Sequence, residues 1–361
     1  MWTHANGLAM NRVLVTGGAG FIGSNLVEAL LAREGVEVLN VDKLVIPGTI
    51  ATLQAFEANP AHRFVRLDLC DASVLARTVA SFRPDVVFHL AAESHVDRSI
   101  DDPGAFVHSN VVGTFNLLEA TRRYWRSLSP GDRNGFRFVH VSTDEVMGSL
   151  EPDDPPFTEA SPYRPNSPYA ASKASADHLA RAWWHTYGLP IIVTNCSNNY
   201  GPRQYPEKLI PLAVTRALAG LEIPVYGDGS NVRDWIFVDD HVAALQRVAT
   251  AGKTGATYVI GGGQERSNLE LVETLCDLLD EMCPKASGSY RDQVRFVPDR
   301  PGHDYRYAID SHRMEHELGW QPECRLAEGL RRTVRWYLDN AEWCRLVTAG
   351  HYEGERLGLP A

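Results

Sequence analysis

Two short stretches of the sequence carry side chains that could move protons on a bound alcohol. Tyr169 and Lys173 form a Tyr-x-x-x-Lys pair within the run Ser-Pro-Tyr-Ala-Ala-Ser-Lys. Upstream of this pair, Thr143, Asp144 and Glu145 follow one another directly. Together these groups can take a proton from an alcohol, take a proton from carbon and protonate a departing hydroxyl group. That is more chemistry than a plain dehydrogenase needs.

Helix signals around the first stretch place the tyrosine and the lysine on one face. Ser167 is a favourable N-cap, Pro168 a favourable first helical residue and Gly188 a favourable stop. Residues at positions i and i+4 of a helix are neighbours, so Tyr169 can lie beside Lys173. The alternative is a helix with a core tyrosine and a surface lysine, because the pair alone often arises by chance.

The two carboxylates follow an apolar run, residues 136–142, that is typical of a buried strand. The carboxyl end of a parallel strand is where α/β folds place their sites. In a continuing strand Asp144 and Glu145 would point to opposite faces, so both can reach one ligand only if the chain leaves strand geometry near Ser142. The alternative is a loop with two solvated carboxylates.

The elements that would position these residues alternate between strands and helices, which predicts an α/β fold of the Rossmann type with a doubly wound parallel sheet. Strands are expected at 13–16, 36–41, 64–68, 86–91, 136–142 and 191–195, with helices to about residue 31, before Pro84, over 106–125 and over 168–187. Beyond residue 200 the rhythm loosens into helices over 208–219, from 240, over 268–282 and over 326–340, with strands at 223–226 and 235–238.

We therefore expect an NAD-binding domain over 10–200, to which the chain returns around 233–262, and a smaller α/β substrate-binding domain over 201–345. Residues 1–9 and 346–361 would be tails. The proline-rich segment 151–168 cannot form regular structure, and it is either a partly ordered lid or a plain surface loop.

The first turn, Thr-Gly-Gly-Ala-Gly-Phe-Ile-Gly, predicts a dinucleotide site. Gly17, Gly20 and Gly23 would allow a tight turn and a close approach of the backbone to a pyrophosphate at a helix N-terminus. Asp42 ends the second strand, where a carboxylate can accept hydrogen bonds from ribose hydroxyls and would repel a 2′-phosphate. This favours NAD over NADP, although the neighbouring Lys43 weakens the preference. A glycine turn that binds no nucleotide is the alternative.

A bound cofactor would also affect the pKa of Tyr169. A free phenol has a pKa of about 10 and is a poor base at neutral pH. We expect the ammonium of Lys173 and the positive nicotinamide of NAD⁺ to lower the pKa of Tyr169.

Composition excludes several classes of function. The 361 residues are 44% hydrophobic and 22% charged, as in ordinary globular proteins, and the net charge of −10 argues against nucleic acid or a membrane as the main partner. No apolar run approaches ~20 residues, and no signal peptide is visible. Six cysteines without a Cys-x-x-Cys pair and histidines without metal-ligand spacing predict a cytoplasmic protein with no metal site.

Several further motifs carry a family resemblance. They include His-Leu-Ala-Ala-Glu-Ser-His-Val-Asp-Arg-Ser-Ile, Ser-Thr-Asp-Glu-Val, Thr-Asn-Cys-Ser-Asn-Asn-Tyr-Gly-Pro, Arg-Asp-Trp-Ile-Phe-Val and Asp-Arg-Pro-Gly-His-Asp. With the glycine turn and the tyrosine pair they resemble the dTDP-glucose 4,6-dehydratases of the extended short-chain dehydrogenase/reductase family, from about Arg12 to about Leu338. Two features depart from the family: Met147 stands where tyrosine is usual, and the loop after it is shorter.

The resemblance implies a role for each catalytic residue. Tyr169, supported by Lys173 and with Thr143 in the hydrogen-bond relay, would take the proton of the sugar 4-hydroxyl. Glu145 would remove the proton on carbon 5, and Asp144 as a neutral acid would protonate the departing 6-hydroxyl. Tightly bound NAD would take the hydride of carbon 4 and return it to carbon 6.

The resemblance also implies two binding sets. The cofactor set is Gly17, Gly20, Phe21, Ile22, Gly23, Asp42, Lys43, Leu44, Asp68, Leu69, Leu90, Ala91, Ala92, Ser109, Tyr169, Lys173 and Asn199. The set for the nucleotide-sugar substrate is Ser94, Thr143, Asn198, Lys208, Leu209, Pro224, Tyr226, Arg233, Asn268, Arg300 and His303. A homodimer through helices 106–125 and 168–187 is implied as well.

Three other functions fit the same frame. A UDP-glucose 4,6-dehydratase would differ in the base that it recognises. A nucleotide-sugar 4-epimerase would not need Asp144 and Glu145. A non-catalytic NAD-sensing module would be expected to lose Tyr169 or Lys173, and this chain keeps both.

Overall fold

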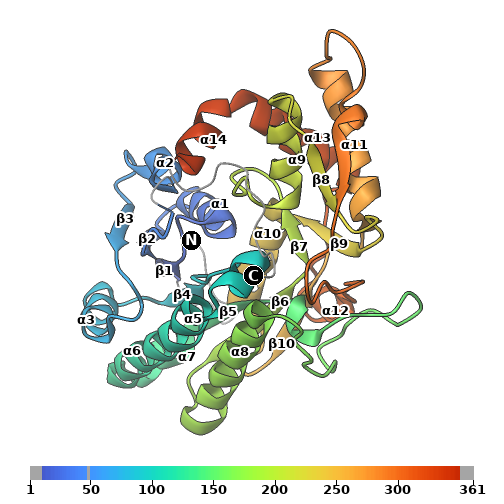
Figure 1. Ribbon diagram of the computed structural model, residues 1–361. Helices are drawn as coiled ribbons and strands as arrows, with labels where there is room; N and C mark the ends of the chain where they lie inside the picture. The colour runs from blue at the N-terminus through green and yellow to red at the C-terminus, as the bar shows by residue number, and fades with distance from the viewer. Residues whose placement is uncertain (1–9, 47–48, 350–361) are drawn as a thin grey trace.

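A seven-stranded parallel sheet forms the centre of the molecule (Figure 1). The computed structural model describes residues 10–46 and 49–349, so the tails expected at 1–9 and 350–361 lie outside the described residues. The strands of the sheet are β1 Arg12–Thr16, β2 Glu37–Asp42, β3 His62–Arg66, β4 Val86–His89, β5 Arg137–Thr143, β6 Ile191–Cys196 and β10 Thr257–Ile260.

Strand order makes this sheet doubly wound, as the sequence predicts. The order is β10-β6-β5-β4-β1-β2-β3, and every neighbouring pair is parallel. The direction of winding reverses between β1 and β4, and a crevice at such a switch point is where open α/β sheets bind their ligands.

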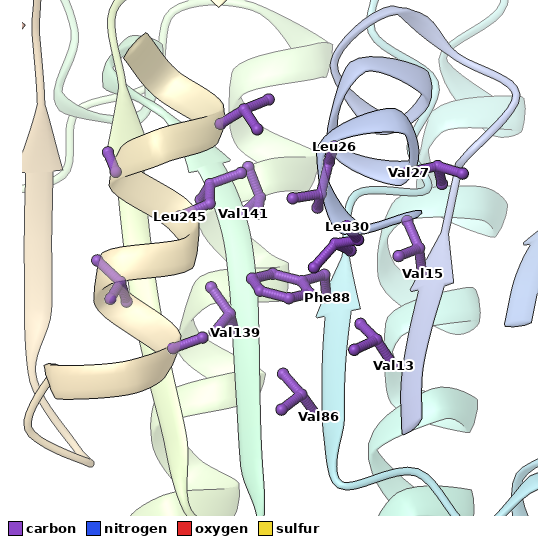
Figure 2. Close-up of a cluster of buried hydrophobic side chains, with 14 of the residues drawn as sticks. Val13, Val15, Leu26, Val27, Leu30, Val86, Phe88, Val139, Val141 and Leu245 are labelled. Carbon is purple, nitrogen blue, oxygen red and sulfur yellow. The ribbon is translucent and has the colours of Figure 1, made fainter. Parts of the chain in front are cut away.

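Helices cover both faces of the sheet. Helices α1 (Phe21–Leu31) and α10 (Val238–Ala251) pack on one face, and α3 (Ala72–Phe82), α6 (Gly113–Ser127) and α8 (Pro168–Tyr187) pack on the other. Successive residues of a strand point to opposite faces. Val13 and Val15 accordingly join the first cluster and Leu14 the second. In Figure 2, Phe88 of β4 lies among side chains from the strands, α1 and α10.

A third hydrophobic cluster lies beyond the edge of the sheet. It is built from β7 Asn198–Tyr200, β8 Ile223–Tyr226, β9 Val232–Phe237, β12 Val294–Val297, α9 Leu209–Leu218, α11 Asn268–Met282 and α13 Leu326–Asp339, and β11 Glu265–Ser267 lies beside it. Strands β11, β9 and β7 form one small sheet, and β12 pairs with β8 in another. The remaining helices are α2 Ile50–Leu53, α4 Val96–Asp101, α5 Pro103–Phe106, α7 Pro130–Gly135, α12 His312–Leu318 and α14 Ala341–Thr348.

The structure departs from the expected elements at several places. The helix expected over 106–125 is divided, because a π-helical turn at Val107–Val112 joins α5 to α6. Strand β3 ends at Arg66, so Asp68 follows the strand rather than ending it. Helix α14 runs three residues into the expected tail, since Trp343 and Val347 give it an inner face that packs on the protein.

The core makes a testable prediction about stability. Phe88 is fully buried in the first cluster, whereas Phe296 on β12 is 58% exposed. Phe88→Ala should lower the free energy of unfolding by about 3–5 kcal/mol, because it removes buried surface and leaves a cavity. Phe296→Ala should change it by less than about 0.5 kcal/mol. Urea unfolding of both variants would measure the difference, and equal losses would contradict this account of the core.

Candidate active site

A cavity of about 440 Å³ lies at the carboxyl ends of the central strands. Its walls come from the glycine turn after β1, the ends of β2, β4 and β5, the start of α8 and the segment 196–208. These segments are far apart in the sequence, and they meet because parallel strands end at the same edge of a sheet.

The glycine turn is shaped for close approach of the backbone. Gly17 has φ +76°, and a Cβ placed on it would lie 2.6 Å from the backbone nitrogen of Ala91. A Cβ on Gly23 would lie 2.1 Å from the carbonyl oxygen of Gly17. Larger residues would therefore force the turn away from the cavity, and the turn leads directly into the N-terminus of α1.

Asp42 is fixed at the end of β2 by two backbone donors. The N–H groups of Ala19 and Leu44 donate to its carboxylate at 3.1 and 2.8 Å. Burial raises the pKa of Asp42, and these hydrogen bonds act in the opposite direction. Lys43 forms an ion pair with Glu93 at 2.9 Å and donates to the hydroxyl of Ser109. The carboxylate of Asp42 is thus held at the cavity wall, where it can accept hydrogen bonds from a ribose.

The structure brings the expected cofactor set together. Of that set, Gly17, Gly20, Phe21, Ile22, Gly23, Asp42, Lys43, Asp68, Leu69, Leu90, Ala91, Ala92, Ser109, Tyr169, Lys173 and Asn199 line the cavity. Leu44 is not among the lining residues; it is buried in the core, and its backbone orients Asp42.

At the other end of the cavity the chain leaves strand geometry where the sequence requires it. Strand β5 ends at Thr143, and Asp144–Met147 form a 3₁₀ turn. The Thr143 hydroxyl accepts from the backbone N–H of Glu145 and donates to Asp144 Oδ1, both at 3.3 Å. Asp144 and Glu145 therefore line the same cavity instead of pointing to opposite faces of a strand.

Burial raises the pKa of both carboxyls, but the charges around them differ. Burial, followed by the charge of Glu145, raises the pKa of Asp144 well above its usual value. Burial also raises the pKa of Glu145, but the cations Arg300, Lys208 and Arg233 oppose this effect. Neighbouring carboxyls titrate as a coupled pair. The surroundings therefore favour the protonated form more strongly at Asp144 than at Glu145.

Helix α8 presents Tyr169 and Lys173 to the same cavity. The Ser167 side chain accepts from the backbone N–H of Ala170 at 3.1 Å, and Gly188 ends the helix with φ +72°. Both caps are as the sequence predicts. Lys173 is buried, and its Nζ donates to the carbonyl oxygen of Val141 at 2.8 Å. The helix is thereby tied to β5 just before the catalytic turn.

The electrostatics of Tyr169 differ from the expectation. Burial and the charge of Glu145 raise the pKa of its phenol well above 10, and a hydrogen bond with Thr143 opposes them. The expected lowering thus does not come from the protein side chains. The reason is that sequence spacing shows neighbouring charges but not the desolvation of a group that is buried.

A buried polar network lies behind Lys173. Asp177, one helical turn further along α8, is fully buried. Its carboxylate accepts from Tyr163 Oη at 2.7 Å and from Asn195 Nδ2 at 3.0 Å, and His140 Nε2 lies at 2.9 Å. Asn195 Nδ2 also donates to the carbonyl oxygen of Thr143 at 3.0 Å. Asp177 therefore joins α8, β5, β6 and the proline-rich segment at the catalytic turn.

The proline-rich segment between Leu150 and Ser167 contains no helix or strand, as expected. Phe157 is buried, and Tyr163 reaches the network of Asp177. Residues 151–166 do not line the cavity, so in this structure the segment supports the site from outside rather than covering it. Met147 is buried in the same small cluster as Phe157.

The residues expected to bind the nucleotide sugar fall into two groups. Ser94, Thr143, Asn198 and Lys208 line the cavity, and Lys208 Nζ donates to the carbonyl oxygen of Ser94 at 2.7 Å. The cavity walls do not include Leu209, Pro224, Tyr226, Arg233, Asn268, Arg300 and His303.

Four of these residues lie near one another. Arg300 pairs with Asp97 at 2.7 Å, Tyr226 Oη donates to Asp97 at 3.0 Å, and the His303 ring lies 6.2 Å from that of Tyr226. Arg233 donates to the carbonyl oxygen of Asp304 at 2.9 Å. The other three belong to helices or strands: Leu209 is the first residue of α9, Asn268 is the first residue of α11, and Pro224 lies in β8.

Sequence reasoning missed several residues of this region. Asp97 is buried and orients both Arg300 and Tyr226. Arg203 lines the cavity with φ +68°, a conformation that is unusual for a residue with a side chain, and pairs with Glu28 at 2.7 Å. His95 and Trp343 also line the cavity. Only the motif containing Asp97 gave any signal in the sequence.

No group of His, Cys, Asp and Glu side chains that could hold a metal ion occurs within residues 10–46 and 49–349. Over the same ranges, no helix is both long and apolar enough to cross a membrane.

The fold and the site define a class of protein: a Rossmann-type enzyme of the extended short-chain dehydrogenase/reductase kind with a dinucleotide cavity and a Thr-Asp-Glu turn. A family model described as GDP-mannose 4,6 dehydratase matches residues 14–333. A dTDP-glucose 4,6-dehydratase of Neisseria meningitidis is 54% identical over 97% of this chain and 99% of its own. One from Escherichia coli is 53% identical over 95% and 97%.

Solved structures support the same family assignment. A dTDP-glucose 4,6-dehydratase from Streptomyces venezuelae, solved with NAD bound, is 47% identical with a TM-score of 0.85 over 93% of this chain and 100% of that one. A UDP-glucose 4-epimerase from Thermus thermophilus in complex with NAD is 33% identical with a TM-score of 0.78 over 91% and 99%. The chain belongs to the dTDP-glucose 4,6-dehydratase family.

The network of Asp177 makes a prediction about pH. Burial alone would raise the pKa of Asp177, but the hydrogen bond and charge of His140 and the charge of Lys173 lower it overall. Its contribution to stability is therefore present above pH of about 4 and lost as the pH falls through the lowered pKa. Asp177→Asn should cost about 3 kcal/mol of unfolding free energy at neutral pH, and the gap from wild type should narrow toward acid.

Tyr163→Phe is the matched control for this prediction. It removes a single donor to Asp177 and should cost about 1 kcal/mol. Urea unfolding at neutral and acidic pH would measure both variants. A loss in Asp177→Asn that is independent of pH would contradict a role for the buried charge.

Proposed function

We propose that this protein is a dTDP-glucose 4,6-dehydratase that converts dTDP-glucose into dTDP-4-keto-6-deoxyglucose. The observation that carries the proposal is the placement of Asp144 and Glu145 in the same cavity as Tyr169, at the end of a dinucleotide-binding crevice. The high identity to curated dTDP-glucose 4,6-dehydratases supports the same activity.

The cavity fits NAD. The turn packs so closely on itself and on Ala91 that Gly17 and Gly23 have no room for side chains, which leaves bare backbone at the N-terminus of α1 for a pyrophosphate, and Asp42 offers a fixed acceptor for ribose hydroxyls. When bound, NAD supplies an acceptor for the hydride of carbon 4, a donor for its return to carbon 6, and in its oxidised form a positive charge that opposes the raised pKa of Tyr169.

The residues of the chain divide the remaining work. Tyr169 takes the proton of the 4-hydroxyl, with Thr143 in hydrogen-bond contact with both Tyr169 and Asp144. The ketone at carbon 4 acidifies the proton on carbon 5, and the carboxylate of Glu145 removes this proton and gives it back to carbon 5 once carbon 6 has received its hydride. The neutral carboxyl of Asp144 gives its proton to the 6-hydroxyl, which leaves as water. The raised pKa of Asp144 suits its role as a neutral acid, and the cations near Glu145 oppose the burial that would protonate the base.

A cluster of cations would hold the diphosphate of the substrate. The protein has a net charge of −10, so an anionic ligand needs local positive charge. Lys208, Arg233 and Arg300 all act electrostatically on Glu145, which places their charges near the catalytic end. A planar guanidinium such as that of Arg233 can bind two phosphate oxygens at once.

We further propose that residues 10–200 mainly bind NAD and residues 201–345 mainly bind the nucleotide.

The alternatives can be separated in one experiment. Purified protein is incubated with dTDP-glucose and, separately, with UDP-glucose, then made alkaline and examined for the near-ultraviolet absorbance of a 4-keto sugar. We expect the band with dTDP-glucose and little or none with UDP-glucose. Galactose-type product would indicate a 4-epimerase, and the absence of any product would indicate a non-catalytic NAD-binding protein.

Variants of the carboxyl pair test the mechanism. Asp144→Asn and Glu145→Gln should slow the elimination by roughly 10²–10⁴-fold while leaving the oxidation at carbon 4 much less affected, because neither carboxyl acts in the first step. Rapid-mixing absorbance of the reduced nicotinamide would follow the oxidation, and keto-sugar formation would follow the whole reaction. Near-normal turnover in both variants would show that other groups perform the elimination.

We also propose a cytoplasmic homodimer. All six cysteines are free thiols, which suits a reducing compartment. Val112, Phe115 and Tyr187 on α6, α8 and the preceding π-helical turn are exposed. The ring of Phe115 contacts that of Trp183, which in turn contacts Tyr187. A second copy packed on these helices would cover this aromatic surface.

The dimer proposal predicts a change in mass. Wild type should sediment as two chains of 40.0 kDa. Phe115→Asp should shift the protein toward the monomer, because the interface would bury an unpaired charge. Phe296→Asp, at an exposed phenylalanine on β12, is the control and should leave the dimer intact. A monomeric wild type would contradict the proposal.

A further inference from the structure

Helix α14, the last helix that the structure describes, contributes to the wall of the cavity at the carboxyl ends of the strands. Trp343 of α14 lines the cavity together with Thr49 and Thr52 of the segment around α2. Its Nε1 donates to Thr52 Oγ1 at 3.1 Å, although the two residues are 291 positions apart. Figure 1 shows α14 extending from α13 to the side of α2.

The contacts of α14 come from one face. Trp343 packs edge-on against Trp336 of α13 at 4.9 Å, and Val347, one turn further, is fully buried. Glu342 and Arg345 pair with each other on the outer face and are both exposed. The helix therefore lies across the protein with its tryptophan directed inward.

Helix α13 anchors this arrangement on the substrate side. Leu330, Val334 and Tyr337 are buried in the third hydrophobic cluster. Tyr337 Oη donates at 2.5 Å to the carbonyl oxygen of Gln204, and Gln204 Nε2 donates at 2.9 Å to that of Asn199. Because Gln204 and Asn199 line the cavity, α13 and α14 together fix two of its walls.

The position of Trp343 indicates which ligand it serves. Thr52 follows β2 in the chain, as does Asp42, the expected acceptor for ribose hydroxyls, at the end of that strand. The catalytic groups Asp144, Glu145 and Tyr169 come instead from the end of β5 and from α8. Trp343 is thus a partner of the β2–α2 side of the cavity.

We propose that α14 is a strap that retains NAD, with Trp343 and its hydrogen bond to Thr52 closing the cavity at the end formed by β2 and α2. The inference rests on the proposed function, in which the same cofactor must take a hydride from carbon 4 and return it to carbon 6. If the reduced cofactor left between these steps, an oxidised sugar would be stranded without its hydride. A closure that slows release of the cofactor protects the reaction from this loss.

The test measures cofactor exchange rather than activity alone. Wild type and Trp343→Ala are loaded with radiolabelled NAD, mixed with excess unlabelled NAD, and the label retained on the protein is followed with time. Trp343→Ala should release the label roughly 10-fold faster or more, because truncating a central aromatic contact acts mainly on dissociation. It should also lose NAD on gel filtration and depend on added NAD for turnover.

Two further variants complete the design. Thr52→Val keeps the size of the side chain but removes the acceptor for Trp343, so it should speed release in the same direction and by a smaller factor. Arg345→Ala changes the exposed face of the same helix and should leave the exchange rate as in wild type. If Trp343→Ala does not fold, Thr52→Val decides the question.

The outcomes separate this inference from the proposed function. Unchanged exchange in both Trp343→Ala and Thr52→Val would overturn the strap even if wild type dehydrates dTDP-glucose. If these variants exchange NAD faster but wild type forms no keto sugar, the strap is supported and the proposed reaction is overturned.

Discussion

The burial of the Thr-Asp-Glu turn is the constraint on which the rest of this site depends. In water, neighbouring aspartate and glutamate side chains would both be ionised at neutral pH, and neither could act as an acid. At the end of β5, burial raises the pKa of Asp144 well above that range, while nearby cations oppose the same effect on Glu145. The protonated form is therefore favoured more strongly at Asp144 than at Glu145, and removal of water from a sugar needs such a difference between an acid and a base in one cavity.

Burial of this kind has to be supported from behind, because charged groups without partners are costly in the interior. Asp177 provides much of that support. It receives Tyr163 and Asn195 as donors, and Asn195 in turn holds the carbonyl of Thr143, where the strand ends. Lys173 on the same helix donates to β5 at Val141. The turn, the helix and the irregular proline-rich segment are thus fixed by a few buried hydrogen bonds rather than by side chains that touch the ligand.

Local signals made much of this predictable from the sequence. The glycine turn, the caps at Ser167 and Gly188, and the requirement that the chain leave strand geometry before Asp144 are each encoded within a few residues. The meeting of these segments in one cavity followed from the rule that parallel strands end at the same edge.

Contacts between residues that are far apart in the sequence could not be predicted from such local signals. Asp97 pairs with Arg300, 203 positions away, and Thr52 accepts from Trp343, 291 positions away. The predicted direction of the pKa shift of Tyr169 was wrong for a related reason, because desolvation depends on the packing of the whole fold. Residues 346–361 were predicted to be a tail because the face of α14 that packs on the protein is short, with Trp343, Cys344 and Val347.

The two ends of the cavity therefore answer different physical demands. The end near β5 must keep its geometry and charge through several proton transfers, and it is built on the sheet and on buried hydrogen bonds. The end near β2 must admit a cofactor and then hold it, and there the wall is a short helix attached through Trp343 with its indole hydrogen bond, Cys344 and the buried Val347. A closure with so few contacts can open without disturbing the sheet, because local openings cost less than global unfolding. Placing the movable wall on the cofactor side leaves the carboxyl pair undisturbed whenever NAD enters.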